Sequence, residues 1–172
     1  MHKKDITTKS RLKRVLWNVV YSLLFRPTPN IFFGWRRFIL RLFGARIGAR
    51  ARIYPSCIIW DPANLIMGCD SCIGSRAIVY NVDSVELGNC TVISQDAYLC
   101  TATKSFWTDT RDLLVAPIKV MDNAWVAADV FVCPGVTIGS KSVVLARCFV
   151  SVEIPAGHVM KMSGSEILEK LV

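Results

Sequence analysis

The chain has 172 residues, of which 52% are hydrophobic, and a formal net charge of +8 at pH 7. This length suits one domain with a sizeable core, and the composition excludes a disordered polymer. The charge favours an anionic partner, which a membrane surface, a nucleic acid or a phosphorylated small molecule could each supply.

Residues 1–46 are predicted to form a basic helical cap. Two helical segments over residues 10–44 are separated by Arg26-Pro-Thr-Pro-Asn30, because each proline removes a backbone donor and restricts the residue before it. The second segment is amphipathic, with arginines interleaved among its apolar residues. The cap would cover one end of the following domain. A second interpretation, compatible with the first, is that residues 9–44 lie on an anionic membrane surface.

The apolar run of this cap, from Val15 to Phe25, is about half the roughly 20 residues that span a bilayer. No small-residue cleavage site follows it, so we expect neither a signal peptide nor a transmembrane helix. The expected location is the cytoplasm, with any membrane contact peripheral and at its inner face.

A six-residue period begins at Ile47 and is the main fold signal. The aliphatic positions are Ile47, Ile53, Ile59, Met67, Ile73, Val79, Leu87, Ile93, Leu99, Val120, Val126, Val132, Ile138, Val144 and Val150. Glycine often follows the aliphatic residue, and a small or thin residue stands four positions after it, at Ala63 too if the count continues from Ile59. This period is typical of a parallel β-helix, in which the aliphatic residue points inward and glycine permits a tight corner.

The period predicts an all-β solenoid over residues 47–157, of about five coils, with a loop at 102–117. Eight-residue steps imply insertions near Asp61-Pro62 and Asp83-Ser84. Residues 158–172 would form a C-terminal tail or cap, helical from Glu166, that covers the other end. The period does not fix the hand of the coil, and right-handed crossovers are the general rule.

The cysteine pattern favours free thiols. Seven cysteines, an odd number without an export signal, fit a reducing cytoplasm. Cys69 and Cys72 form a Cys-x-x-Cys pair, but the only histidines are His2 and His158, and a zinc site needs more ligands than one such pair. We expect no metal.

Three stretches carry a family resemblance: FFGWRRFILRLFGARIG at 32–48, VISQDAYLCT at 92–101 and API-x-V-x-x-x-AWVAADVFVCPGVTIG at 116–139. They resemble the hexapeptide-repeat acyltransferases, especially the colanic acid biosynthesis acetyltransferase group of the maltose and galactoside O-acetyltransferase branch. The resemblance implies a left-handed β-helix and a homotrimer with acetyl-CoA bound along the coils between subunits. It also implies transfer of acetyl to a sugar hydroxyl during capsule or exopolysaccharide assembly.

The same resemblance points to a missing catalytic base. The family carries a histidine shortly after Tyr-Leu-Cys-Thr, which takes the proton of the attacking hydroxyl, and Lys104 stands at that position here. A lysine acts as a base only when burial or a cationic neighbour lowers its pKa. The alternative is a catalytically silent scaffold or partner subunit. His158 is the other candidate base, although it also fits an exposed place at the end of the last coil.

The resemblance also implies coenzyme contacts at Trp125, Ala127, Ala146 and Lys161. The family's Gly-Asn-Pro-Ala segment is absent after Lys161, and the tryptophan and alanines would equally suit packing. Candidate acceptor contacts in the loop are Trp107 and Asp109. We expect no nucleic acid, because no aromatic platform or reading motif accompanies the basic residues.

Overall fold

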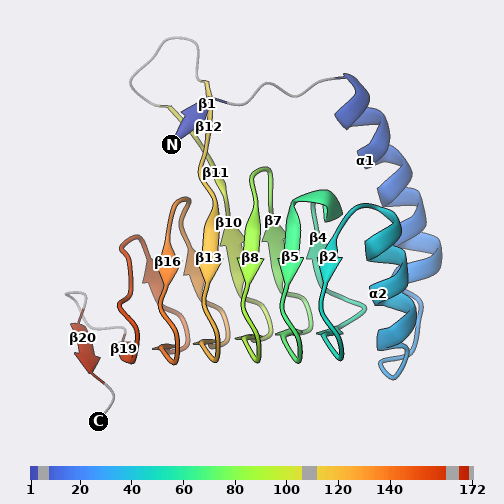
Figure 1. Ribbon diagram of the computed structural model, residues 1–172. Coiled ribbons are helices and arrows are strands. Elements are labelled where there is room, and N and C mark those ends of the chain that lie inside the picture. Colours follow the sequence, from blue (N-terminus) through green and yellow to red (C-terminus); the bar gives the residue numbers. More distant parts are fainter. Residues whose placement is uncertain (4–7, 106–111, 162–166, 171–172) are drawn as a thin grey trace.

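The computed structural model describes residues 1–3, 8–105, 112–161 and 167–170. Its body is a three-faced coil of short parallel strands, and two helices pack against one end of it (Figure 1). The helical segments are α1 (Thr8–Val20), a π-helical turn η1 (Tyr21–Phe25) and α2 (Phe33–Leu42). The break between η1 and α2 falls at the two prolines, as predicted.

Each face of the coil is a sheet built from one strand of every coil. The first face contains β2 (Arg46–Ile47), β5 (Leu65–Met67), β8 (Val85–Leu87), β13 (Ile118–Val120) and β16 (Thr137–Ile138). The second contains β3 (Arg52–Ile53), β6 (Cys72–Ile73), β9 (Val92–Ile93), β14 (Trp125–Val126), β17 (Val143–Val144) and β19 (His158–Lys161). The third contains β4 (Ile58–Ile59), β7 (Ile78–Tyr80), β10 (Tyr98–Cys100), β15 (Phe131–Val132) and β18 (Phe149–Val150).

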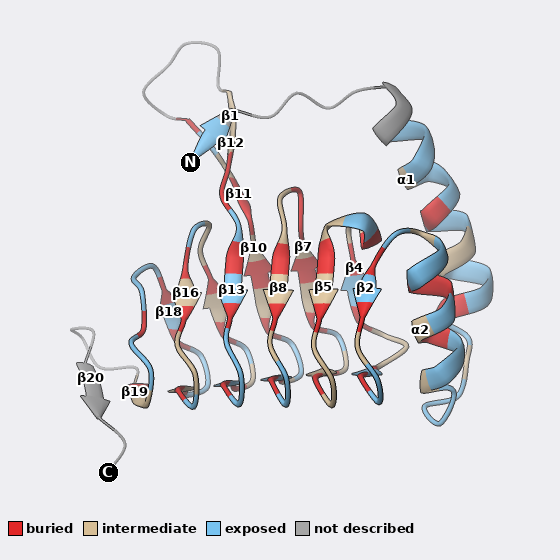
Figure 2. Ribbon diagram, in the orientation of Figure 1, coloured by how far each residue is buried: buried red, intermediate tan, exposed pale blue. Residues whose placement is uncertain are grey.

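The inward residues confirm the six-residue period. All of the aliphatic positions named above are at most 7% exposed, and Figure 2 shows the buried positions alternating with exposed ones along the coils. They stack in register, since Ile73 pairs with Ile53 on one side and Ile93 on the other. Burying a side chain of this size contributes roughly 1.5–3 kcal/mol, so this column is the main source of stability.

The corners differ from the expectation in one respect. Glycine is needed there for close approach rather than for an unusual φ, because a Cβ on Gly68 would lie 2.6 Å from the backbone nitrogen of Asn89 in the next coil. The left-handed conformation falls mostly on a non-glycine corner residue with φ between 53° and 64°, at Arg50, Asp70, Arg76, Cys90, Asp96, Asn123, Asp129, Lys141 and Arg147, and glycine takes it at Gly135 and Gly157.

Two further expectations were wrong. Ala63 is exposed and lies in a 3-10 turn, η2 (Pro62–Asn64), while Leu65 takes the inward place, because the insertion at this corner shifts the count by two. The C-terminal segment contains a strand, β20 (Ile167–Lys170), antiparallel to β19, and not the expected helix, because the last coil offers it an open sheet edge.

The helical cap seals the first coil with side-chain donors. No coil precedes this one, so its carbonyls on that side need other partners. Arg36 Nε donates to Ile53 O at 2.6 Å, and Trp17 Nε1 donates to Ile59 O at 2.7 Å. Tyr21, Arg37 and Arg41 serve the carbonyls of Cys57, Ala51 and Ile47 in the same way. Much of the basic character of the cap is therefore structural.

Candidate functional site

The four predicted coenzyme contacts lie along one edge of the coil, where the second face turns into the third. Trp125 begins β14, and Ala127 follows that strand. Ala127 N donates to Val144 O, and Leu145 N donates to Met160 O, so Lys161 occupies the equivalent column two coils later. Ala146 stands at the same corner of the intervening coil. The structure thus brings Trp125, Ala127, Ala146 and Lys161 to a single edge.

This edge is hollowed between successive coils. A hollow of about 580 Å³ is lined by Gln95, Asp96, Ala128, Asp129, Ala146 and Arg147. A second, of about 420 Å³, continues from Gln95 toward Tyr54. The first has a volume typical of ligand sites, and two of its lining residues, Ala128 and Ala146, have small side chains. A narrow, flexible coenzyme arm would fit such a groove.

Trp125 forms part of the rim of the edge. Its side chain is exposed, and its indole Nε1 donates to Ser94 Oγ at 2.9 Å across two neighbouring coils. Ala127, in contrast, is 7% exposed. Its place is consistent with packing as well as with close approach of a ligand to the backbone.

Ion pairs between coils set the charge of the groove. Arg76 forms a bidentate pair with Asp96, with N–O distances of 2.7 and 2.6 Å, and Arg147 Nε lies 3.5 Å from Asp129 Oδ2. The hydrogen bonds from Arg76 hold the pKa of Asp96 below its usual value. Each carboxylate of the groove therefore has a guanidinium neighbour, and the two arginines balance the two aspartates.

Lys104 lies at a different edge, where the third face turns into the first. It ends β11 (Ala102–Lys104), which pairs with β12 (Leu113–Val115), and β1 (His2–Lys3) adds a third antiparallel strand. The side chain of Lys104 is exposed. Within one chain, nothing described buries it, and the groove is on the neighbouring edge. Trp107 and Asp109, the predicted acceptor contacts, lie outside the described residues.

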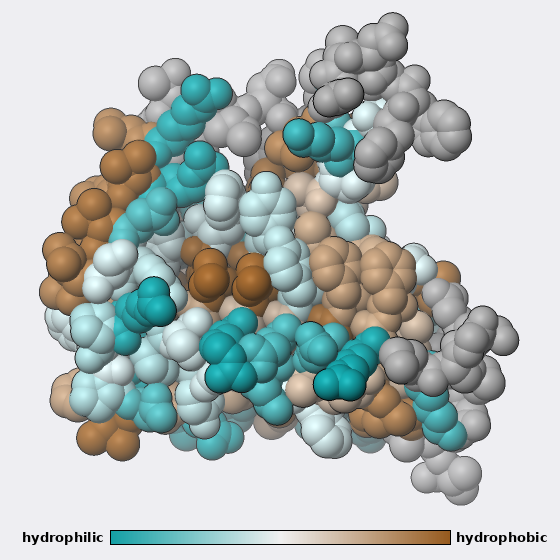
Figure 3. All heavy atoms as spheres, turned by 180° about the vertical axis from the view of Figure 1, so that it is seen from behind, coloured by the Kyte–Doolittle hydropathy of each residue, from teal (hydrophilic) through white to brown (hydrophobic). Residues whose placement is uncertain are grey.

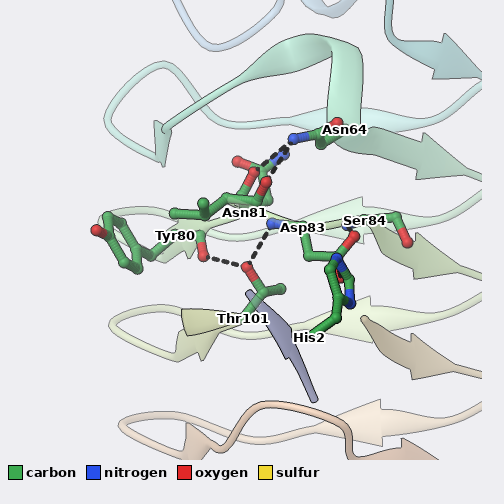
Figure 4. A network of polar contacts seen from close by, with 8 residues as sticks. His2, Asn64, Tyr80, Asn81, Asp83, Ser84 and Thr101 are labelled. Carbon is green, nitrogen blue, oxygen red and sulfur yellow. Dashed lines mark hydrogen bonds and ion pairs between the residues drawn. The ribbon is translucent and has the colours of Figure 1, made fainter. Parts of the chain in front are cut away.

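A polar network supports the corner from which this hairpin leaves. Asn81, which is fully buried, exchanges hydrogen bonds with the backbone of Asp61, while Asn64 Nδ2 donates to the carbonyls of Asn81 and Val82. Thr101 Oγ1 accepts from Asp83 N at 3.0 Å and donates to Tyr80 O. Figure 4 shows these residues converging on one corner. The insertions predicted from the eight-residue steps are held here.

Sequence reasoning missed one pair in this corner. His2 Nε2 lies 3.7 Å from Asp83 Oδ2, an oxygen that is otherwise buried and without a hydrogen bond. The strand order β1-β12-β11 puts His2 and Lys104 on opposite edges of the hairpin sheet. No local signal links residue 2 to residue 83, since the contact depends on the long-range pairing of β1 with β12. His158 begins β19, and its Nδ1 lies 2.9 Å from Ala156 O.

In the part of the chain that the structure describes, neither a metal site nor a membrane span is found. Among the described residues, no three His, Cys, Asp or Glu side chains gather as metal ligands would. In that same part of the chain, no helix has the length and apolar character needed to cross a bilayer. All seven cysteines are free thiols, and burial raises the pKa of Cys57 to about 12.

Comparison with known proteins places the chain in a family. It is 36% identical over 161 residues to WcaF of Escherichia coli (strain K12), whose name assigns it to colanic acid biosynthesis as an acetyltransferase, and the match covers 94% of this chain and 88% of that protein. The chain belongs to the hexapeptide-repeat acetyltransferases. No family model matches it. A shorter match, 24% identical over 127 residues, is to galactoside O-acetyltransferase of the same organism, and it covers 72% of this chain and 63% of that one.

Solved structures of this family share the fold. A maltose O-acetyltransferase from Clostridium difficile 630 superposes with a TM-score of 0.85 at 20% identity, over 96% of this chain and 89% of that one. A hexapeptide-repeat acetyltransferase from Vibrio cholerae, solved with acetyl-CoA, gives 0.84 at 18% identity, over 97% and 91%. The coil is therefore the left-handed parallel β-helix that the resemblance implied, and not the right-handed form of the general rule.

Proposed function

We propose that this hexapeptide-repeat acetyltransferase is an O-acetyltransferase that uses acetyl-CoA to acetylate a sugar hydroxyl in capsule or exopolysaccharide biosynthesis. The observation that carries the proposal is the hollowed edge at Ala128 and Ala146, in a chain that is 36% identical to a named acetyltransferase over almost its whole length. In this reaction the sugar oxygen forms an ester bond to the acetyl carbon and the thioester C–S bond breaks. A base takes the hydroxyl proton and passes it to the departing sulfur, so that CoA leaves as its thiol.

The geometry supports an active site between subunits. Lys104 and the hollowed edge lie at two different corners of the same chain, so a neighbouring subunit is needed to bring a hairpin against a groove. The outward residues of the second and third faces favour such contact, since Trp125, Val92, Ile58 and Phe149 are all at least 36% exposed. The first face instead carries Arg46, Glu86 and Lys119 outward. We propose a homotrimer, which sedimentation analysis would test.

Two side chains at the hairpin corner are candidate bases in this proposal. Lys104 stands at the family's histidine position, and an adjoining subunit could supply the burial that one chain lacks. His2 is the other, because Asp83 lies against its imidazole. Lys161 and Trp125 would contact the coenzyme. The proposal also places the chain in the cytoplasm, at the inner face of the membrane, through residues 9–44.

Two measurements test the function. The first is calorimetric titration of the protein with acetyl-CoA, and the second is mass spectrometry of a panel of sugars incubated with enzyme and coenzyme. We expect one coenzyme per subunit and an acetylated sugar. Lys104→Ala should abolish transfer without changing coenzyme binding, and Lys141→Ala, an exposed lysine at a distant corner, should change neither. Loss of transfer in His2→Gln alone would assign the base to His2.

Two results would contradict the proposal. Saturable binding without transfer to any sugar would favour the catalytically silent scaffold, which the exposure of Lys104 in the single chain also favours. No binding at millimolar coenzyme would exclude acyl transfer altogether.

A further inference from the structure

The outward face of the helical cap is apolar. The exposed hydrophobic side chains on α1 and η1 include Leu12, Val15, Leu16, Val19 and Leu23, and those on and before α2 include Ile31, Trp35, Phe38 and Leu42. We call these nine residues the outer stripe. Leu12 is 71% exposed, Ile31 81% and Leu42 68%. Figure 3 shows hydrophobic side chains gathered over the helical end of the molecule, at the left of that view.

The spacing of these residues places them on one side of each helix. Apart from the adjacent pair Val15 and Leu16, successive positions differ by three or four residues, so they form a stripe at the helical period. Trp17 and Tyr21 on the first helical segment, and Arg36 on the second, point the other way and bind first-coil carbonyls. The helical cap therefore presents an apolar stripe toward solvent, while polar donors and buried apolar side chains such as Phe25 and Leu40 face the coil.

The two halves of the outer stripe form one surface. Trp35 Nε1 donates to Leu24 O at 2.8 Å, which ties α2 to η1. The rings of Trp35 and Phe38 lie 5.9 Å apart, so the aromatic part is continuous as well. A solenoid cap ordinarily presents a polar outer face for solubility. A contiguous exposed apolar surface on such an element indicates a partner.

Charge identifies the kind of partner. Residues 6–60 contain no Asp or Glu, whereas Lys and Arg recur through them. Arg36, Arg37 and Arg41 are engaged with the first coil. The exposed basic residues that remain beside the outer stripe include Arg11, Lys13 and Arg26. At about 100° per residue, Arg11 and Lys13 flank Leu12 on both sides.

We propose that the outer stripe is a docking surface for an anionic phospholipid membrane. An apolar stripe with Trp, Phe and Leu between basic flanks is the pattern of a helix that lies in the plane of the membrane interface. A second copy of this chain is a poorer occupant, because pairing two such surfaces would bring basic flanks together with no nearby carboxylate to balance them. The membrane supplies both an apolar layer and negative charge.

This surface deepens the cellular placement within the proposed function and does not depend on acetyl transfer. The cap lies at one end of the coil (Figure 1). In the proposed homotrimer, a three-fold axis parallel to the long axis of the β-helix would put three outer stripes at the same end. Membrane binding would then be multivalent, and much tighter than one stripe alone would give.

Vesicle flotation tests the docking surface. The probes are vesicles containing phosphatidylglycerol and vesicles of phosphatidylcholine alone. The full chain should float with the anionic vesicles, and less so as salt is added. Leu16→Gln combined with Phe38→Gln should reduce binding at least about tenfold, since two apolar side chains no longer enter the interface. Met121→Gln, which changes an exposed apolar residue at the corner that follows β13, away from the cap and from the proposed subunit contact, should leave binding unchanged.

The outcomes separate the alternatives. The proposal is overturned if the unaltered chain does not float, or if the double variant floats as well as the unaltered chain. Dissociation of a larger assembly by the double variant, without vesicle binding, would assign the surface to a second copy. Each variant's acetyl-CoA binding and circular dichroism report its folding. A chain that floats but transfers no acetyl group would refute the proposed enzyme and leave the docking surface standing.

Discussion

Replacing Arg36 by Leu should strongly destabilise the protein. Arg36 is fully buried and makes four hydrogen bonds, from Nε to Ile53 O at 2.6 Å and from its two terminal nitrogens to Thr28 Oγ1, Pro29 O and Asn30 O. Leucine would leave these acceptors without a donor. A bond to a charged group contributes about 1.5–3 kcal/mol, but such contributions are not additive. We therefore expect a loss of about 3–5 kcal/mol in the free energy of unfolding.

Urea denaturation at one fixed protein concentration measures this loss, and Arg37→Leu is the matched control. Arg37 is only half-buried and makes one of the capping bonds, to Ala51 O at 2.9 Å, so its loss should be about 1 kcal/mol. A thermal scan should show Arg36→Leu melting roughly 6–20 °C lower. A loss below about 1 kcal/mol for Arg36→Leu would refute the account in which side-chain donors seal the first coil.

The remaining predictions concern corners and thiols. Gly68→Ala should lower the free energy of unfolding by about 1–3 kcal/mol, because the added Cβ would overlap the backbone of the next coil. Gly34→Ala in α2, where a Cβ would meet no heavy atom closer than 3.7 Å, should raise it by roughly 0.5–1 kcal/mol. Urea denaturation measures both changes. The guanidinium partner of Asp96 lowers the pKa of this carboxyl, so Asp96 stabilises the fold above about pH 4 and less as the pH falls. In Asp96→Asn, the free energy of unfolding should therefore depend less on pH in the acidic range. At pH 8, iodoacetamide should label the exposed Cys90 and leave Cys57 unlabelled, because Cys57 is buried and its pKa is about 12. Mass spectrometry measures the labelling, and labelled Cys57 in the folded protein would contradict the prediction.

The coil was predictable because its stability depends on a repeated local pattern. Ile53, Ile73 and Ile93 repeat the same environment once per turn, so a period in the sequence becomes a column in the structure. The prediction that Ala63 takes an inward position was wrong because an insertion shifts the count, and sequence spacing does not show where inside a corner the extra residues lie. The prediction of a helix in the C-terminal tail was wrong because pairing with an open sheet edge outweighed the helical preference of a short segment.

The site was only partly predictable, for the same physical reason. Trp125, Ala127, Ala146 and Lys161 fall on one edge because each stands within two residues of the same repeat position in successive coils. Lys104 lies in an insertion that breaks the repeat, so periodicity gives neither its strand nor its exposure. The contact of His2 with Asp83 joins residues 81 positions apart through β1 and β12, and no pattern in the sequence encodes it.

The sealed first coil also limits growth of the solenoid. A parallel coil could in principle continue into a second molecule, since each end of the stack presents a strand edge ready to pair. Here the side chains of Trp17 and Arg36 occupy carbonyls that an incoming strand would need. At the far end, β20 runs antiparallel to β19 and interrupts the parallel ladder. Both features therefore oppose end-to-end growth of the coil into a fibre.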